Sequence, residues 1–292
     1  MSGKGQRFID AGYKDPKPLI EVEGRPIISH VIDLFSKDDE FIFICNREHL
    51  ESTNMYSILN QYSPAGKIVD IDSHKKGPVY AVSKVYEYID NDEPAIINYC
   101  DFSCYWNYSN FRKWLKQVNC DGCIPSYKGF HPHSLGNTNY AYLKEIDNKV
   151  KEIQEKRPYT NNRMNEFASS GTYYFAKGRY IKKYFDEAIQ EGLNTKGEYY
   201  CSLVYNLMIR DHLNVNVYEL EHFMQWGTPS DLEEYIQWSN IFKDNIRITN
   251  ENCQIGTTII PMAGKGSRFL QEGYKIPKPL ISINNQPMVI NS

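Results

Sequence analysis

The stretch that decides the fold is Met1-Ser-Gly-Lys-Gly-Gln-Arg-Phe8, which continues through Gly12-Tyr-Lys-Asp-Pro-Lys-Pro-Leu-Ile20. Glycine has no Cβ, so a loop of this type can present backbone N–H groups to an anion at close range. Arg7 adds a bidentate positive fork and Lys17 a positive point charge, and the prolines on either side of Lys17 stiffen its backbone. The stretch therefore predicts a polyphosphate site. Its predicted binding residues are Gly3, Lys4, Gly5, Arg7 and Lys17.

The same stretch occurs a second time, late in the chain. Met262-Ala-Gly-Lys-Gly-Ser-Arg-Phe269 continues into Gly273-Tyr-Lys-Ile-Pro-Lys-Pro-Leu-Ile281 at a constant offset from the first copy. A short apolar and β-branched run, Thr257–Met262, precedes this second copy and predicts a buried strand that leads into the loop. The first copy begins inside the loop, without such a run before it. The second-copy equivalents of the site residues are Gly264, Gly266, Arg268 and Lys278.

The duplication leaves three arrangements open. The chain can be a fragment of a tandem protein, cut just after a new repeat begins. The late strand can instead fill the empty place in the same fold, as in a circular permutant, or fill that place in a neighbouring chain as a strand-swapped dimer. We therefore expect a domain over residues 1–242 that lacks its first strand, a polar linker over residues 243–256, and the start of a second copy over residues 257–292.

Composition and charge exclude several classes of partner. A net charge of −3 gives no argument for a nucleic-acid partner or for an anionic membrane surface. No run approaches the length of a membrane-spanning helix, and Met1 is not followed by a signal-peptide pattern. Seven cysteines without regular spacing are typical of reduced thiols. We expect a cytoplasmic protein that neither binds nucleic acid nor inserts into a membrane, and we leave a homo-oligomer open.

Strands and helices alternate through the first part of the chain, which predicts an α/β fold with a mostly parallel, Rossmann-like sheet flanked by helices. The predicted strands are Pro18–Val22, Glu40–Cys45, Lys67–Ile71, Ala95–Asn98 and Gly122–Pro125, and the predicted helices are Pro26–Phe35, Arg47–Gln61, Pro78–Tyr88 and Asn107–Val118. Ligands of such sheets bind beyond the carboxyl ends of the strands. The first loop, Gly77 and Asp101 each follow such a strand end, so we expect them along one edge.

The pattern changes in the second half of the chain. Two neighbouring runs, Tyr140–Lys144 and Val150–Gln154, predict a small antiparallel sheet. Further strands are predicted at Gly171–Phe175 and Val215–Glu219, and helices at Arg179–Glu191 and Tyr199–Asp211. Ser230 with Glu233 three residues later has the spacing of a capping box and predicts a helix start. Lys243–Gln254 is polar and aperiodic, and we interpret it as the linker.

The order of these motifs resembles that of the sugar-phosphate nucleotidylyltransferases, the pyrophosphorylases that make nucleotide sugars. The motifs that carry the resemblance are Gly3, Gly5 and Arg7; Pro16-Lys17-Pro18; Gly77; Asp101; Glu155-Lys156 with Arg157 before Pro158; Gly171-Thr-Tyr-Tyr-Phe175; Gly197-Glu198; and Gly227-Thr228. The resemblance covers about Met1–Tyr235 and implies the nucleotide-diphospho-sugar transferase fold. The ending Trp226-Gly-Thr-Pro229 is most similar to bacterial capsule and surface-polysaccharide members.

This resemblance implies a reaction and a role for each nucleotide-side residue. An NTP and a sugar-1-phosphate, or a similar phosphate monoester, would give an NDP-sugar and pyrophosphate. Arg7 would hold the β- and γ-phosphates, Lys17 would neutralise charge at the α-phosphate, and Asp101 would bind Mg²⁺. Gly77 would leave room for the base. These residues are the expected catalytic and nucleotide-binding set.

On the acceptor side the resemblance implies a second set of roles. Glu155 and Glu198 would accept hydrogen bonds from sugar hydroxyls, Lys156 would meet the sugar phosphate, and Gly171 would leave room for the sugar ring. One position departs from the family pattern, because Gln225 stands where a second metal-binding aspartate is common. An amide is a poorer Mg²⁺ ligand than a carboxylate. The metal would then depend on Asp101, phosphates and water, or on a nearby acid such as Glu221.

Two other functions stay open at this point. Gln225 and the missing strand are compatible with a non-catalytic nucleotide or sugar-phosphate binding module from a tandem enzyme. A glycosyltransferase of the related nucleotide-sugar-binding (GT-A-like) fold would usually carry an Asp-x-Asp pair. This chain has Asp101-Phe102-Ser103 instead, which argues against that alternative.

Overall fold

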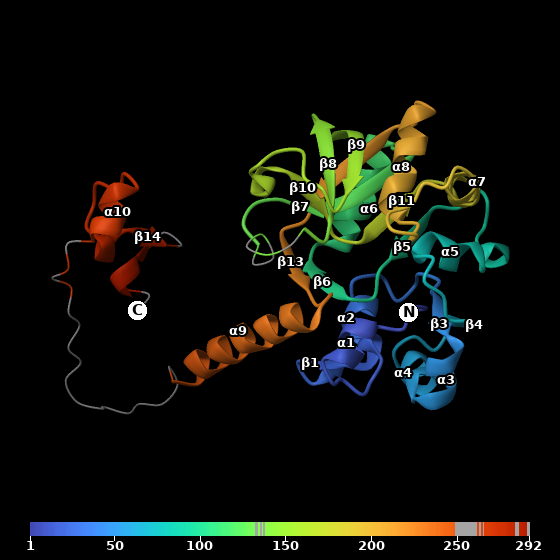
Figure 1. Ribbon diagram of the computed structural model, residues 1–292, viewed down its shortest axis with the longest axis horizontal. Helices are drawn as coiled ribbons and strands as arrows, with labels where there is room; N and C mark the ends of the chain where they lie inside the picture. The colour runs from blue at the N-terminus through green and yellow to red at the C-terminus, as the bar shows by residue number, and fades with distance from the viewer. Residues whose placement is uncertain are drawn as a thin grey trace. The chain divides into compact units, whose positions relative to one another are not determined.

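The computed structural model describes residues 1–131, 134, 136, 138–248, 262, 264, 266–283 and 286–290 (Figure 1). The chain divides into two compact units, Met1–Phe242 and Lys243–Ser292. The strand predicted before the second copy of the signature lies outside the described residues, except for Met262.

The first unit is built on a seven-stranded sheet with the strand order β10-β8-β9-β12-β7-β11-β5. Its strands are β5 (Ala95–Asn98), β7 (Gly122–Tyr127), β8 (Ala141–Ile146), β9 (Lys149–Glu155), β10 (Phe167–Ser169), β11 (Thr172–Phe175) and β12 (Val215–Glu219). Strands β12 and β7 pair in parallel, and the other paired neighbours in this sheet run antiparallel. The α/β class is confirmed, but the sheet is mixed rather than mostly parallel.

A tight turn accounts for one antiparallel pair of this sheet. Asp147 and Asn148 join β8 to β9 with positive φ angles of 53° and 62°, which is the geometry of a two-residue hairpin turn. A hairpin of this kind returns the chain antiparallel without a helical crossover. The two strands do pair as predicted, but they belong to the large sheet, because β9 also pairs with β12.

Three two-stranded sheets complete the first unit. The pairs are β1 (Glu21–Val22) with β2 (Arg25–Pro26), β3 (Ile42–Asn46) with β4 (Lys67–Ile71), and β6 (Phe102–Tyr105) with β13 (His222–Gln225). The pair β3–β4 is parallel and the other two are antiparallel. The predicted bounds of β4, β5 and β12 are confirmed to the residue, whereas β6, β10 and β13 were not predicted.

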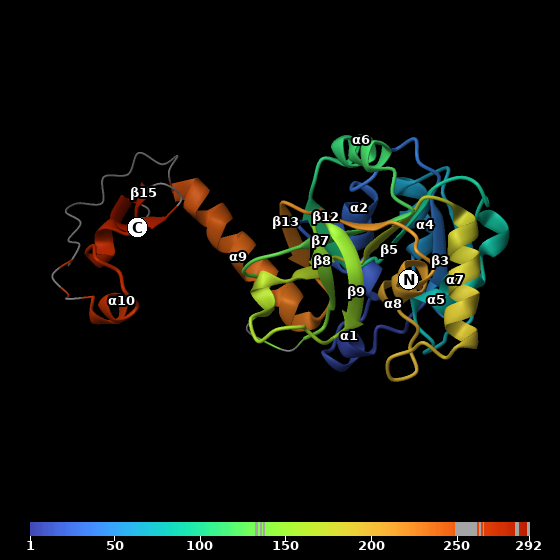
Figure 2. The same cartoon turned by 90° about the horizontal axis from the view of Figure 1, so that it is seen from above.

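Helices cover both faces of the large sheet, because successive side chains of a strand point to opposite faces. Cys123 of β7 lies in a core cluster with Phe111 of α6, and the next residue, Ile124, lies in the larger cluster with Val204 of α8. Figure 2 shows α6 on one side and α7 and α8 on the other. The helices around the sheet are α5 (Pro78–Ser83), α6 (Tyr108–Val118), α7 (Gly178–Gln190) and α8 (Cys201–Arg210).

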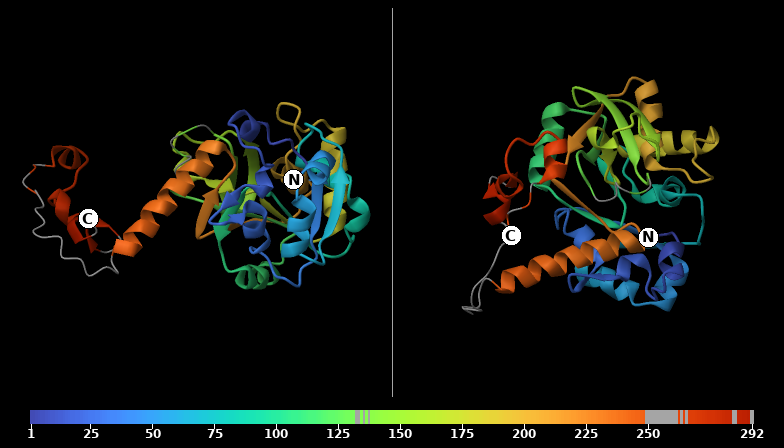
Figure 3. Two further views of the ribbon diagram at one scale, coloured as in Figure 1. Left: turned by 90° about the horizontal axis from the view of Figure 1, so that it is seen from below. Right: turned by 60° about the vertical axis from the view of Figure 1, so that its left-hand side comes forward.

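The N-terminal residues pack beside the β3–β4 pair, as the blue and cyan segments show in Figure 3. We call residues 1–29 the first head. Its elements are α1 (Gln6–Asp10), a 3-10 turn at Lys17–Leu19, β1, β2 and the start of α2 (Ile27–Ile32). The helices around it are α3 (Arg47–Ser52), α4 (Met55–Tyr62) and α9 (Pro229–Ile248). Phe8 and Leu19 share one core cluster with Leu59 of α4 and Leu232 of α9. This cluster fixes the loop of the first head against the body of the unit.

Three sequence predictions around this head need correction. The strand expected over Pro18–Val22 is confined to β1, and the prolines of Pro16-Lys17-Pro18, which lack an N–H donor, precede it in a 3-10 turn. The helix expected over Arg47–Gln61 is divided into α3 and α4, since Thr53 is extended. The linker expected from residue 243 begins within α9, which continues to Ile248.

The second unit repeats the local structure of the first head. We call residues 262–290 the second head; it contains α10 (Ser267–Gln271), a 3-10 turn at Lys278–Leu280, β14 (Ser282–Ile283) and β15 (Gln286–Pro287). Gly266 precedes α10 with a φ of 61°, as Gly5 precedes α1 with a φ of 67°. Leu280 is 54% exposed, whereas its counterpart Leu19 is 6% exposed. The two heads therefore adopt the same local backbone conformation.

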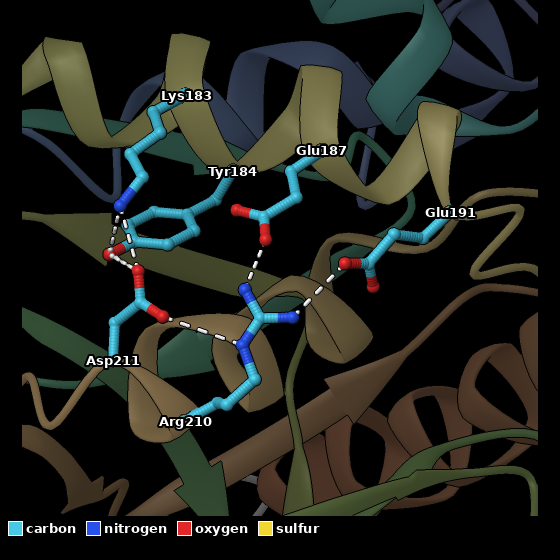
Figure 4. A network of polar contacts seen from close by, with 6 residues as sticks. All are labelled: Lys183, Tyr184, Glu187, Glu191, Arg210 and Asp211. Atoms are coloured by element: carbon cyan, nitrogen blue, oxygen red, sulfur yellow. Dashed lines mark hydrogen bonds and ion pairs between the residues drawn. The ribbon is translucent and has the colours of Figure 1, made fainter.

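A network of charged side chains joins α7 to the end of α8 (Figure 4). Arg210 binds Glu187 and lies 3.1 Å from Glu191, both on the α7 side. Asp211 accepts a hydrogen bond of 2.7 Å from Lys183. The network aligns the two helices, and α8 in turn carries Ser202 beneath the site described next.

Candidate active site

Lys17 and Asp101 meet, as predicted, although they are distant in sequence. Lys17 Nζ donates a hydrogen bond of 2.9 Å to Asp101 Oδ2 and one of 2.6 Å to the backbone oxygen of Gly227. The side chains of Lys17 and Asp101 are 17% and 32% exposed, so the pair is sheltered but open on one side. Phe8 lies beneath the ammonium group, with its ring centre 5.0 Å from Nζ. Three contacts therefore fix one positive charge beside one carboxylate.

The glycine loop lies open next to this pair. A Cβ at Gly3 or at Gly5 would meet nothing within 4 Å, so the loop has free space on that side. Gly5 adopts a left-handed φ that favours glycine, and Lys4 and Arg7 are exposed. The first residue of the loop, Met1, lies beside the end of β3, where the N–H of Asn46 donates a hydrogen bond to the backbone oxygen of Met1 over 3.4 Å. A polyanion can therefore reach the backbone and both side chains.

The predicted acceptor residues form a second group at the end of β9. Glu155 Oε2 accepts a hydrogen bond of 2.7 Å from Ser202 Oγ. Burial raises the pKa of the Glu155 carboxyl to about 7, against the opposing effects of the Ser202 hydrogen bond and the Lys156 charge. Lys156 Nζ donates to the Tyr200 hydroxyl over 2.6 Å, and that hydroxyl donates to Glu198. The structure thus brings Glu155, Lys156 and Glu198 together.

The charge of Arg7 acts on this second group. Burial and the Glu198 carboxylate raise the pKa of the Tyr200 phenol, and the positive charge of Arg7 is close enough to oppose them. Gly171 contributes close packing here, since its φ is 100° and a Cβ would lie 3.1 Å from the ring of Tyr99. The charge of Arg7 therefore links the loop side electrostatically to the acceptor side of the candidate site.

Close packing requires a glycine at position 77, and the sequence does not reveal this requirement. Its φ is 83°, and a Cβ at this position would lie 2.7 Å from both the N and the O of Tyr199. Backbone hydrogen bonds hold the two segments together, from Tyr199 N to Lys76 O over 2.9 Å and from Val79 N to Tyr199 O over 3.2 Å. Gly77 therefore positions the segment that carries Tyr200. Its expected contact with a base stays a prediction.

The start of α9 is capped by a different pair from the one predicted. Asp231 N donates to Thr228 Oγ1 over 3.2 Å, and Thr228 N donates to Asp231 Oδ2 over 3.0 Å. The prediction of Ser230 with Glu233 as the capping pair was therefore wrong. The sequence did contain the correct signal, because Thr228 and Asp231 have the same three-residue spacing.

Three further residues lie beside the Lys17–Asp101 pair or its supporting loop: Gln225, Tyr140 and Asp231. The sequence motifs assign no role to Gln225 beyond that of a weak metal ligand and do not indicate the other two. Gln225 is 6% exposed and uses both ends of its amide: Nε2 donates to Asp231 Oδ1 over 2.7 Å, and Oε1 accepts from the Tyr140 hydroxyl. A Cβ built on Gly227 would lie 3.8 Å from Oδ2 of Asp101 and of Asp231. Asp231, rather than Glu221, is thus the second acid beside Gly227.

The described residues contain no group of three or more histidine, cysteine, aspartate or glutamate side chains that could hold a metal by themselves. Asp101 is the partly exposed carboxylate next to the loop, and Asp231 is already bonded to Gln225 and Thr228.

In the second head, Gly266 lies close to Lys278, with 3.5 Å between its built Cβ and the lysine Cβ. Gly264, Arg268 and Lys278 thus repeat the loop locally.

The fold is that of the nucleotide-diphospho-sugar transferases, and the class of protein is a nucleotidyltransferase. The family model for the MobA-like NTP transferase domain matches residues 1–162, and the chain belongs to this family. No curated protein matches the sequence. None of the described helices is both long and apolar enough to cross a membrane.

Solved structures share the fold. A nucleoside-diphosphate-sugar pyrophosphorylase from Vibrio cholerae is 19% identical, covers 81% of this chain and 98% of its own, and superposes with a TM-score of 0.65. A UDP-glucose pyrophosphorylase from Acinetobacter baumanii is 14% identical, with 85% and 97% coverage and a TM-score of 0.62. A CTP:phosphocholine cytidylyltransferase from Streptococcus pneumoniae is 20% identical, with 82% and 96% coverage and a TM-score of 0.57.

Proposed function

We propose that this protein joins an NTP to a sugar-1-phosphate, or to a similar phosphate monoester, and releases pyrophosphate. The observation that carries the proposal is the Lys17–Asp101 pair, 2.9 Å apart, beside an open glycine loop. An acceptor phosphate oxygen attacks the α-phosphorus in line, and the bond from that phosphorus to the oxygen of the departing pyrophosphate breaks. Both reactants are anions, so positioned positive charge is the main requirement.

On the nucleotide side, the amides of Gly3 and Gly5 and the guanidinium of Arg7 hold the β- and γ-phosphates and the pyrophosphate that departs. Lys17 is held at its two oxygen partners and presents its charge to the α-phosphate. Gly77 leaves its backbone accessible to the base. These roles place stabilising charge where negative charge accumulates during transfer.

On the acceptor side, Lys156 meets the attacking phosphate. Glu155 and Glu198 bind hydroxyl groups of the acceptor, and Gly171 leaves room for its ring. The raised pKa of Glu155 means that its carboxyl can donate as well as accept a hydrogen bond near neutral pH. This group selects the acceptor, whereas the loop side binds the part that every NTP shares.

Mg²⁺ is the cofactor that fits these residues. Asp101 offers one partly exposed carboxylate, which suits a Mg²⁺ ion that takes most of its ligands from phosphate oxygens and water. Gln225 does not contribute, because both ends of its amide are engaged by protein groups. Bound Mg²⁺ would neutralise phosphate charge during transfer.

A cytoplasmic location and a role in surface or capsule polysaccharide synthesis complete the proposal. The second of these depends on the resemblance of the Trp226–Pro229 ending.

Pyrophosphate release tests the proposal. The protein is mixed with Mg²⁺, each of the four NTPs, and a panel of sugar-1-phosphates together with phosphocholine, since one structural neighbour is a phosphocholine cytidylyltransferase. Release that requires both an NTP and one acceptor class supports the proposal. Thermal stabilisation by nucleotide without release for any acceptor would instead support the non-catalytic binding module.

A further inference from the structure

A continuous run of hydrogen bonds connects the start of α9 to the end of β9. Thr228 N donates to Asp231, Asp231 accepts from Gln225 Nε2, and Gln225 Oε1 accepts from the Tyr140 hydroxyl. The backbone oxygen of Tyr140 then accepts from the N–H of Lys156 over 2.9 Å. The run therefore ends on a proposed acceptor-binding residue.

The backbone at Lys156 needs such support. Its φ is 59°, a left-handed conformation that residues with a Cβ adopt at an energetic cost. Segment 138–140 holds it from both sides, because Thr138 Oγ1 also donates to the backbone oxygen of Lys156 over 2.8 Å. The direction of the Lys156 side chain is thus set by a segment that Gln225 fixes through the Tyr140 hydroxyl.

The middle of the run is attached to the residue that carries the proposed metal-binding carboxylate. Gln225 of β13 is in register with Phe102 of β6, and Trp226 N donates to the backbone oxygen of Asp101 over 3.0 Å. Asp101 and Lys156 therefore share one support. We propose that Gln225 is a positioning residue that fixes Lys156, through Tyr140, relative to Asp101; this inference rests on the proposed function of the site.

The chemistry of the side chain explains why an amide is required here. An amide can accept from Tyr140 and donate to Asp231 at the same time. A carboxylate at position 225 would have no proton to donate, and it would place a second negative charge against Asp231. Burial, with the Asp231 and Asp101 charges, raises the pKa of the Tyr140 phenol, so its hydroxyl stays a donor. The departure from the family pattern at Gln225 thus has a positive role.

The test uses Gln225→Met, Tyr140→Phe and the double variant, with Gln61→Glu as an exposed control on α4. Tyr140→Phe removes one hydroxyl and keeps the test valid if Gln225→Met folds poorly. Hydrogen exchange at residues 155–157 reports on the Lys156 N–H directly and does not depend on activity. Initial-rate measurements give the KM for the acceptor and for the NTP separately.

We expect each variant to accelerate exchange at residues 155–157 and to raise the acceptor KM about tenfold, with the NTP KM within about twofold of wild type. Since both variants break the same run, the double variant should be no worse than the more affected single variant. Unchanged exchange at these residues, or an NTP KM that rises as much as the acceptor KM, overturns the inference. If wild type releases no pyrophosphate, the proposed function fails, and the exchange result alone decides the positioning role.

Discussion

Lys17 Nζ lies 2.9 Å from Asp101 Oδ2, and the same nitrogen donates to the backbone oxygen of Gly227 over 2.6 Å. The lysine comes from the first head, the aspartate follows β5, and the glycine follows β13. Three segments that are distant in sequence therefore fix one ammonium group. These contacts hold the ammonium group in place before a phosphate arrives, as stabilisation by preorganised charge requires.

Removing either member of this pair should abolish most activity. Lys17→Ala removes charge at the α-phosphate, and Asp101→Ala leaves Lys17 without its carboxylate partner, so we expect turnover to fall by about 100-fold or more in each variant. Lys14→Ala, an exposed lysine three residues away, is the control and should retain wild-type turnover. Steady-state pyrophosphate release measures the effect. Near-normal release by either site variant would refute its assignment.

The duplicated signature gives a second comparison. Lys278 repeats Lys17 in the second head, and Lys17 binds Asp101 within the first unit. We therefore expect Lys278→Ala to keep turnover within about twofold of wild type while Lys17→Ala loses it. The reverse result would mean that the second head has taken over the site. Recovery of activity on mixing the two variants would then identify exchange between chains.

The sequence motifs predict the Lys17–Asp101 pair better than the strand directions of the large sheet. Lys17 and Asp101 could be inferred because rigid prolines and a strand end restrict where each side chain can lie. The antiparallel pairing of β8 with β9 is predicted correctly, but the antiparallel pairing of β11 with β5 and β7, which makes the sheet mixed, is not predicted. The predicted bounds of β5 were correct, since a short apolar run between polar segments has few alternatives.

Other parts of the site depend on contacts that no local pattern encodes. At Gln225 the family pattern predicts a weakened metal ligand, because no local motif indicates its partners Tyr140 and Asp231, which lie 85 and 6 residues away. The family pattern predicts that Gly77 leaves room for the nucleotide base. Its contact with the backbone of Tyr199 depends on the folded chain and has no local sequence signal. Tertiary hydrogen bonds and close backbone contacts are therefore what the sequence reading missed.

Glu155 should make stability depend on pH. Burial raises the pKa of its carboxyl from 4.5 to about 7, so the folded state binds this proton more tightly than the unfolded state. The free energy of unfolding should then be highest below about pH 4.5 for this group and fall as the pH rises through about 7, by on the order of 3 kcal/mol. Glu155→Gln has no such proton and should lose less stability over the same range.

Urea unfolding of wild type and Glu155→Gln at pH 5 and pH 8 measures this difference, because other titrating groups contribute equally to both proteins. Glu152→Gln is the matched control: Glu152 lies on the same strand and is exposed. This control should follow wild type at both pH values. If the Glu155→Gln curve also parallels wild type, the Glu155 carboxyl is already ionised at neutral pH.

Gly77→Ala should destabilise the protein more than an alanine at another glycine with positive φ. Gly192 is the comparison, because its φ of 67° is also positive but a Cβ there meets nothing within 4 Å, whereas Gly77, at φ 83° and ψ 177°, also lies in a region that only glycine adopts readily. Gly192→Ala should cost about 1 kcal/mol for the backbone conformation alone. At Gly77 the new Cβ must also displace the Tyr199 backbone, 2.7 Å away, which adds roughly 1 to 3 kcal/mol and moves Tyr200 and Lys156. Gly77→Ala should therefore also raise the acceptor KM, and equal unfolding free energies for the two variants would show that the Tyr199 backbone moves aside without cost.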